Sequence, residues 1–164
     1  MKKHFILFVI LFTAYQGFCQ ADSGKPLYLR FPVVPQFTIF NASDSTAFTR
    51  DNLHKKKPVV FIFFSPDCEH CQKETESLIT NLDKFKNAQI VMITYMPYDM
   101  MQQFYKNYKI ANYPLITMGR DGKYLLPTFF NVKSLPAIYV YDKKGKFKQS
   151  FEGSVKIEKI ALAL

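Results

Sequence analysis

The chain has 164 residues, of which 48% are hydrophobic and 21% charged, and its formal net charge is +9. This is the composition of a globular protein, and it excludes a mainly disordered, collagen-like or mucin-like chain. The length suits one domain with a sizeable core and is too short for two medium-sized domains.

Residues 1–19 are predicted to be a secretory signal peptide. The chain starts with two lysines after Met1, continues with an uncharged apolar run over residues 5–12, and has a small residue, Gly17, near the expected cleavage site at Cys19. A lipid anchor on Cys19 is a weaker alternative, because Phe18 is bulky where a small residue is expected. A retained anchor is also weaker, since the run is shorter than the roughly 20 residues that a spanning helix needs. We expect an exported, periplasmic protein without stable membrane insertion after cleavage.

The expected mature chain remains basic. Two of the 22 basic residues lie in the signal segment, so 20 remain against 13 acidic residues, a net charge of +7. Many lysines fall in two short clusters, at residues 55–57 and 143–148. Export argues against nucleic acid as a partner. We interpret the clusters as solvated loops and protected sheet edges, the alternative being a surface for acidic partners or membranes.

Residues 20–54 are predicted to form an N-terminal extension that contains a β-hairpin. A proline followed by alternating apolar residues predicts a short strand. The stretch of small polar residues after it predicts a turn. In chain order we expect a loose segment (20–30), a strand (35–40), a turn (41–46), a return strand (47–49) and a helical turn (51–54).

Residues 55–164 are predicted to form an α/β domain. Residues 58–64 and 89–95 are apolar runs rich in β-branched and aromatic side chains, which indicates strands buried on both faces of a parallel sheet. Between them, apolar side chains recur at helical spacing from Leu78 to Phe85 and predict a helix that continues to about Lys86. Strand, helix and strand then make a βαβ unit.

The C-terminal part is predicted to add two helices and a hairpin. We interpret Met100, Met101, Phe104 and Tyr108 in the first of these helices as mostly packing residues. The expected elements are a helix (98–108), a turn (120–123), two antiparallel strands (136–141 and 146–151) and a final helix (155–164).

The feature with evident chemistry is Cys68-Glu69-His70-Cys71, directly after a buried strand and at the start of a helix. Two cysteines three residues apart on the first helical turn bring their sulfurs close enough for a disulfide. Cys68 faces the free N–H groups and the positive end of the helix, which stabilise a thiolate, whereas Cys71 lies one turn deeper. This asymmetry predicts Cys68 as nucleophile and Cys71 as resolving thiol, and the context is typical of a thioredoxin-like redox site.

Two other kinds of site can use the same cysteine pair. The pair could be a structural staple in a non-catalytic interaction module, or it could bind copper or another soft metal in a chaperone. A zinc site would need four ligands, and the pair has no evident third ligand once Cys19 is removed. We therefore expect neither a metal nor a cofactor.

Three segments resemble the TlpA-like branch of the thioredoxin superfamily, which comprises exported thiol-disulfide oxidoreductases. Residues 61–74, Phe-Ile-Phe-Phe-Ser-Pro-Asp-Cys-Glu-His-Cys-Gln-Lys-Glu, resemble its strand, active site and helix start. Residues 35–40 resemble its added N-terminal hairpin, and residues 132–142 with Gly145 resemble its cis-proline loop and following hairpin. The resemblance covers the chain from about residue 33 to the end.

This resemblance implies a fold, an activity and partners. The fold would be thioredoxin-like, with a mixed central sheet, helices on both faces and an N-terminal β-hairpin extension. The activity would be exported thiol-disulfide exchange, and the partners would be cysteine-containing exported proteins and an unidentified redox partner.

The resemblance also implies roles for single residues. The Leu135–Pro136 bond would be cis and face the cysteines, leaving the backbone of Leu135 free to pair with an extended substrate segment. Glu74 matches an acid of some cytochrome-maturation members, where it could move protons to or from the buried thiol; the alternative is an acid that complements the helix dipole. His70 would help to stabilise the reduced thiolate, as in strongly oxidising members, unless it is merely exposed.

The chain departs from the TlpA-like pattern beside the first cysteine. Asp67 replaces the usual aromatic residue, and together with Glu69 it should oppose a thiolate on Cys68, so the sequence does not fix the redox potential. Ser65 stands three residues before Cys68, as in peroxiredoxins. That family's proline is replaced here by Phe61, which argues against peroxidase activity as the main function.

Overall fold

The computed structural model describes residues 24–164. The predicted signal peptide and Cys19 lie outside the described residues. None of the described helices is long and apolar enough to cross a membrane. The elements are α2 (Leu27–Arg30), β1 (Thr38–Asn41), β2 (Ala47–Thr49), η2 (Arg50–Asn52), β3 (Val59–Phe63), α3 (Glu69–Thr80), η3 (Leu82–Phe85), β4 (Gln89–Thr94), α4 (Tyr98–Asn107), η4 (Ile110–Asn112), β5 (Ile116–Arg120), α5 (Leu125–Phe130), β6 (Ala137–Tyr141), β7 (Phe147–Glu152) and α6 (Ile157–Leu162).

One mixed sheet of seven strands, in the order β2-β1-β5-β4-β3-β6-β7, forms the centre of the molecule. The three strands β3, β4 and β5 run parallel, with Val60 opposite Ile90 and Ile90 opposite Ile116. β6 lies antiparallel to β3, and β7 antiparallel to β6. The predicted βαβ unit and the C-terminal hairpin are both confirmed.

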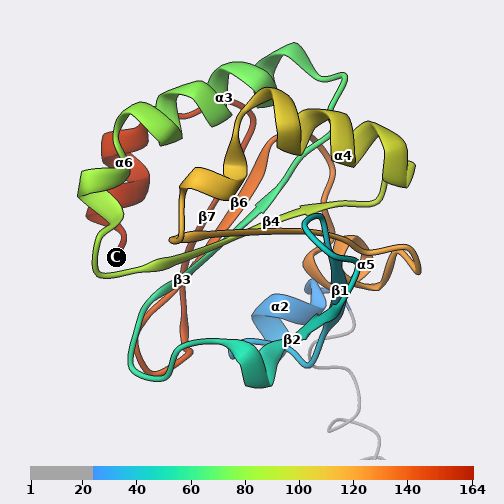
Figure 1. The fold of residues 1–164 in the computed structure, drawn as a ribbon. Coiled ribbons are helices and arrows are strands. Elements are labelled where there is room, and N and C mark those ends of the chain that lie inside the picture. The colour runs from blue at the N-terminus through green and yellow to red at the C-terminus, as the bar shows by residue number, and fades with distance from the viewer. Residues whose placement is uncertain (1–23) are drawn as a thin grey trace, which may run out of the picture.

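Helices cover both faces of this sheet, which confirms the predicted layer arrangement. α3, α4 and α6 lie on one face, and α2 and α5 on the other (Figure 1). Every residue of β3 and of β4 is buried, because a parallel sheet covered on both faces exposes neither set of side chains. Phe130 of α5 is fully buried, with its ring 4.4 Å from that of Tyr139 and 5.3 Å from that of Phe63.

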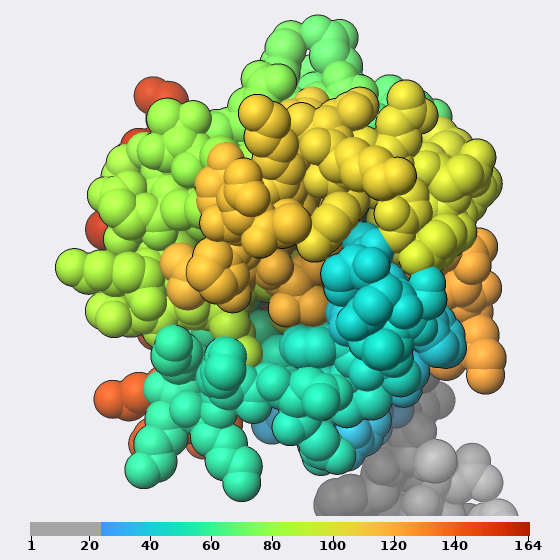
Figure 2. Space-filling model, in the orientation of Figure 1, coloured from blue at the N-terminus to red at the C-terminus, as the bar shows by residue number. Residues whose placement is uncertain are grey.

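The predicted N-terminal hairpin is present and extends the sheet. Thr38 of β1 pairs with Thr49 of β2. On its other side, β1 pairs antiparallel with β5, where Phe40 lies opposite Arg120. The hairpin also contacts α4, since the hydroxyls of Ser45 and Tyr98 are 2.5 Å apart. Figure 2 shows this hairpin, in cyan, directly beside the yellow α4. The extension is thereby packed against the helix that borders the cysteine site.

Two expectations for the elements are wrong, and two elements were not expected. The helix after Cys68 ends at Thr80 rather than near Lys86, because Asn81 turns the chain into the separate 3-10 helix η3. The segment expected to be loose contains α2, whose Tyr28 packs 5.1 Å from the Tyr139 ring. β5 and α5 were not predicted from the sequence.

The packing of β5 against β1 requires a glycine. A Cβ atom on Gly119 would lie 2.8 Å from Cδ1 of Ile39 and 3.0 Å from the carbonyl oxygen of Phe40. Ile39 is completely buried, so the side chain has little room to move aside. Gly119 therefore allows the hairpin to join the central sheet closely.

Candidate active site

The cysteine pair lies where β3 ends and α3 begins. After Phe64, Ser65-Pro66-Asp67 turns the chain, and the Cys68 N–H donates to the Ser65 carbonyl at 3.2 Å. The Ser65 hydroxyl donates to the Asp67 carboxylate. One turn into the helix, the Gln72 amide donates to the Pro66 carbonyl at 2.8 Å. The turn is therefore fixed from both sides at the carboxyl end of a buried strand.

The two cysteines differ in exposure and are both free thiols. Cys68 is the N-cap of α3, and its Sγ accepts a hydrogen bond of 3.3 Å from the Cys71 N–H. Cys71 is 1% exposed, whereas Cys68 is half-buried. A backbone donor and the positive end of the helix favour negative charge on the Cys68 sulfur. The predicted arrangement, with one outer and one inner sulfur, is the one found.

The inner thiol does not ionise readily. Burial raises the pKa of Cys71 to about 12, and the hydrogen bond and charge of Cys68 add to this effect. A thiol needs to lose its proton before it can attack a disulfide. Cys71 therefore requires a nearby proton acceptor at neutral pH.

Glu74 is a buried acid on the same face of α3 as Cys71. The two residues are three apart and both are buried, so they project from one side of the helix. Oε2 of Glu74 accepts from the Val155 N–H at 3.4 Å, whereas Oε1 is buried and has no partner among residues 24–164. Burial raises the pKa of Glu74, and the Val155 hydrogen bond only partly offsets this. An exposed acid that simply complements the helix dipole would not be placed in this way.

The Leu135–Pro136 segment lies against the outer cysteine. The peptide bond is cis, and the Cys68 Sγ is 3.9 Å from the Leu135 carbonyl oxygen. The Pro136 carbonyl accepts from the Gly153 N–H at 2.8 Å, which ties this loop to the end of β7. Within the described chain, the backbone N–H of Leu135 donates no hydrogen bond.

The structure leaves His70 apart from the sulfurs. Its side chain is exposed on the first turn of α3, and it makes no hydrogen bond to Cys68 or Cys71 in the part of the chain described. Beside it, Glu69 forms an ion pair of 2.6 Å with Lys73. This hydrogen bond and the lysine charge lower the pKa of Glu69.

Residues not selected from the sequence also border the site. Burial raises the pKa of Tyr95, and further contributions come first from Tyr124 and then from the charges of Asp67 and Cys71. The Tyr95 and Tyr124 rings are 4.7 Å apart. Tyr124 reaches this place through a left-handed backbone conformation with φ 57°. No local sequence signal predicts that conformation.

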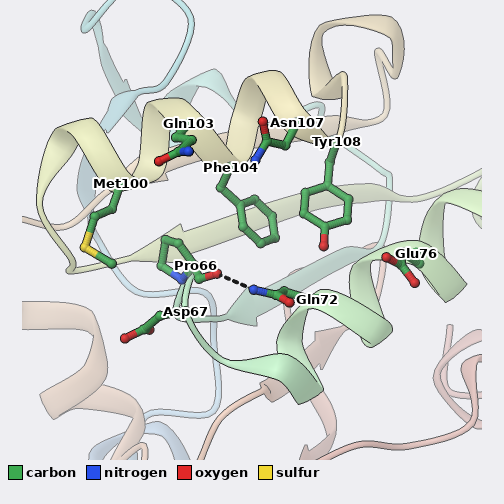
Figure 3. Close-up of a pocket in the computed structure, with 9 residues that line it drawn as sticks. All are labelled: Pro66, Asp67, Gln72, Glu76, Met100, Gln103, Phe104, Asn107 and Tyr108. Atoms are coloured by element: carbon green, nitrogen blue, oxygen red, sulfur yellow. Dashed lines mark hydrogen bonds between the residues drawn. The ribbon is translucent and has the colours of Figure 1, made fainter.

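The four residues of α4 and its C-cap that were interpreted as packing residues divide into two groups. Met101 and Phe104 are buried in the core, as predicted. Met100 and Tyr108 are only half-buried and line a cavity of about 560 Å³ that also includes Asp67. Figure 3 shows this cavity between α3 and α4.

The described residues offer no metal centre beyond the two sulfurs. Between residues 24 and 164, no three or more His, Cys, Asp or Glu side chains gather in a way that could hold a metal ion. The copper-chaperone alternative therefore gains no third ligand of these four residue types among residues 24–164.

Solved structures with the same fold are found among redox proteins. One is a secreted disulfide oxidoreductase from Mycobacterium tuberculosis, described as homologous to Escherichia coli DsbE, with 23% identity, a TM-score of 0.66, and coverage of 78% of this chain and 93% of that one. The peroxidoxin BcpB from the same organism has 17% identity and a TM-score of 0.68, and the match covers 80% and 92% of the two chains. StoA from Bacillus subtilis has 17% identity and a TM-score of 0.60, over 80% and 98%. At these identities the likeness shows a thioredoxin-like fold.

The chain therefore has a thioredoxin-like fold with a cysteine pair at the start of a helix. A search of curated proteins finds no matching relative. The model of the AhpC/TSA family matches residues 33–150. The chain therefore belongs to the AhpC/TSA family.

Proposed function

We propose that the protein is an exported thiol-disulfide oxidoreductase of the TlpA-like type, which exchanges disulfides with cysteines of other exported proteins. The observation that carries this proposal is the asymmetry of the pair: the Cys68 sulfur is half-buried at the helix start, 3.9 Å from the Leu135 carbonyl, and Cys71 is buried one turn below. A staple in a non-catalytic module would not need one accessible sulfur.

The reaction consists of two exchange steps. The Cys68 thiolate attacks one sulfur of a partner disulfide, forming a mixed disulfide and releasing the partner's other sulfur as a thiolate, which takes up a proton. Cys71 then loses its proton and attacks the Cys68 sulfur. The Cys68–Cys71 disulfide forms, the bond to the partner breaks, and the partner leaves with both cysteines reduced. A separate redox partner supplies the two electrons that restore the dithiol.

Glu74 is the acceptor for the Cys71 proton in this proposal. It lies on the buried face of α3 with Cys71, and its Oε1 has no hydrogen bond inside the described chain. Burial raises the pKa of the Glu74 carboxyl and so brings it closer to the pKa of the Cys71 thiol. A smaller difference between the two pKa values makes proton transfer easier.

The Leu135–Pro136 segment would bind the partner polypeptide. The Leu135 N–H is free of any partner within residues 24–164, and the carbonyl oxygen of the same residue lies 3.9 Å from the outer sulfur. An extended segment can add to such a backbone by strand-like hydrogen bonds. Export is supported by the N-terminal sequence pattern and by the structural neighbour from M. tuberculosis, which is a secreted protein.

Insulin reduction by the mature chain tests this proposal. With dithiothreitol as electron donor, the wild type should accelerate precipitation of the insulin chains, and Cys68→Ser should abolish the acceleration. Thr80→Ser, which changes an exposed residue at the far end of the same helix, serves as a control and should behave as wild type. A wild-type protein that neither reduces insulin nor equilibrates with glutathione would contradict the proposal.

A further inference from the structure

A groove beside the outer cysteine has a composition unlike the rest of this basic protein. It lies between α3 and α4, has a volume of about 560 Å³, and begins at Asp67, the residue before Cys68. Figure 3 shows the Phe104 and Tyr108 rings projecting from α4 toward Pro66 and Gln72, with Glu76 at the far end. The residues that line it are Pro66, Asp67, Gln72, Glu76, Met100, Gln103, Phe104, Asn107 and Tyr108.

The groove carries negative charge and no positive charge. Asp67 and Glu76 are among its lining residues, which include no lysine, arginine or histidine, although the whole chain has a net charge of +9. Asp67 is engaged by the Ser65 hydroxyl. The neighbouring Lys73 forms its ion pair with Glu69, and the charge of Glu76 is only a lesser cause of the raised pKa of Lys73, after Glu69. Within residues 24–164 the Glu76 carboxylate has neither an ion pair within 4 Å nor a hydrogen bond.

The remaining lining groups suit a cation with N–H donors. The half-buried Tyr108 ring lies 4.3 Å from the buried Phe104 ring, and an accessible aromatic face such as that of Tyr108 attracts guanidinium and ammonium groups. The charge of Glu76 contributes, after burial, to raising the pKa of Tyr108, and both residues line the groove. The side-chain oxygens of Gln103 and Asn107 accept no hydrogen bond from any described residue.

We propose that this groove binds an arginine or lysine side chain of the partner polypeptide, a few residues away from the partner's cysteine. The inference rests on the proposed function and adds a preference for basic segments. Glu76 lies about 12 Å along the helix from Cys68, at about 1.5 Å per residue. An extended partner chain covers this distance in about four residues at about 3.3 Å each. Because an arginine or lysine side chain is itself long, fewer residues between the partner's cysteine and its basic residue are enough.

Exchange rates with matched peptides test the inference. Disulfide-linked peptides would differ at one position, two to four residues from the cysteine, carrying arginine, glutamine or glutamate. For the wild type we expect the arginine peptide to have a kcat/KM about tenfold above that of the glutamate peptide, from one solvent-accessible ion pair and a cation–aromatic contact. The ratio should fall in 0.5 M salt, because salt screens exposed charges.

Two variants, each replacing one acidic side chain with its amide, test whether the preference for arginine arises in the groove. Glu76→Gln should reduce the arginine-to-glutamate ratio to about threefold or less, since it removes the unpaired carboxylate. Asp99→Asn removes an exposed acid of α4 that does not line the groove, and it should retain the wild-type ratio. Retention of the full ratio in Glu76→Gln would overturn the inference.

The outcomes separate this inference from the proposed function. Equal rates for all three peptides, or a preference for glutamate, would overturn the groove assignment while leaving thiol-disulfide exchange intact. Absence of exchange with every peptide would overturn the proposed function and the groove assignment together.

Discussion

Replacing Glu74 with leucine should stabilise the protein, and the gain should grow as the pH rises. The pKa of Glu74 is raised in the folded state, so the folded protein favours the protonated carboxyl relative to the unfolded chain. The stability linked to this proton is fully present below the ordinary carboxyl pKa of 4.5 and is lost as the pH rises through the raised value. Leucine does not titrate, so the variant should not lose this stability.

The size of the gain follows from the contacts of the carboxyl group. A buried polar group without a partner costs about 1–3 kcal/mol, and Oε1 is such a group among the described atoms. The hydrogen bond lost at Oε2 is long, 3.4 Å, and only partly buried, so it offsets little. We expect a gain of about 2 kcal/mol near pH 8, equivalent to a rise in Tm of about 4–8 °C for a chain of this size.

Urea denaturation of the reduced protein, followed by circular dichroism from pH 4 to pH 8, measures this gain. Glu76→Leu is the matched control, because it removes an exposed acid from the same helix and should change stability by no more than about 0.5 kcal/mol. Glu74→Leu should also slow release of the partner from the mixed disulfide. A difference in stability that is constant from pH 4 to pH 8, or a destabilised Glu74→Leu protein, would refute the argument.

Three further predictions concern the core, the hairpin junction and the thiols. Phe130→Ala should lower the free energy of unfolding by about 3–5 kcal/mol, because the ring is fully buried among aromatic neighbours; a loss below about 1 kcal/mol in urea denaturation would contradict this packing. Gly119→Ala should cost about 1–3 kcal/mol, since its Cβ would lie 2.8 Å from Ile39, and unchanged Tm would show that the contact relaxes. Iodoacetamide at pH 8 should label Cys68 far faster than Cys71, whose pKa is about 12; comparable labelling in peptide mass spectra would contradict the buried position of Cys71.

The elements that could be predicted from the sequence are those with a long and uniform hydrophobic pattern. The apolar runs that became β3 and β4 are buried along their whole length, and the polar residues of β4, Gln89 and Thr94, lie only at its two ends. β5 was missed because Thr117 and Gly119 interrupt its apolar pattern. α5 was missed because it is only six residues long and contains Pro127, which normally disfavours a helix interior.

The cysteine pair was predictable because its geometry is local. A spacing of three residues on the first helical turn fixes the relation of Cys68 to Cys71 without long-range information. The burial of Glu74 depends instead on the segment around Val155, 81 residues away, and the proximity of Tyr95 to Tyr124 depends on the packing of β4 beside β5. These relations arise from tertiary structure, which a single sequence does not reveal.

Trapping of the mixed disulfide tests the central claim most directly. Cys71→Ser, incubated with a disulfide-linked peptide, should gain the mass of one peptide strand on Cys68, and this adduct should persist because the resolving thiol is absent. In the wild type the adduct should be transient and the Cys68–Cys71 disulfide should replace it. An adduct that does not form on Cys71→Ser, or that forms equally on Cys68→Ser, would contradict the assignment of an outer nucleophile and an inner resolving thiol.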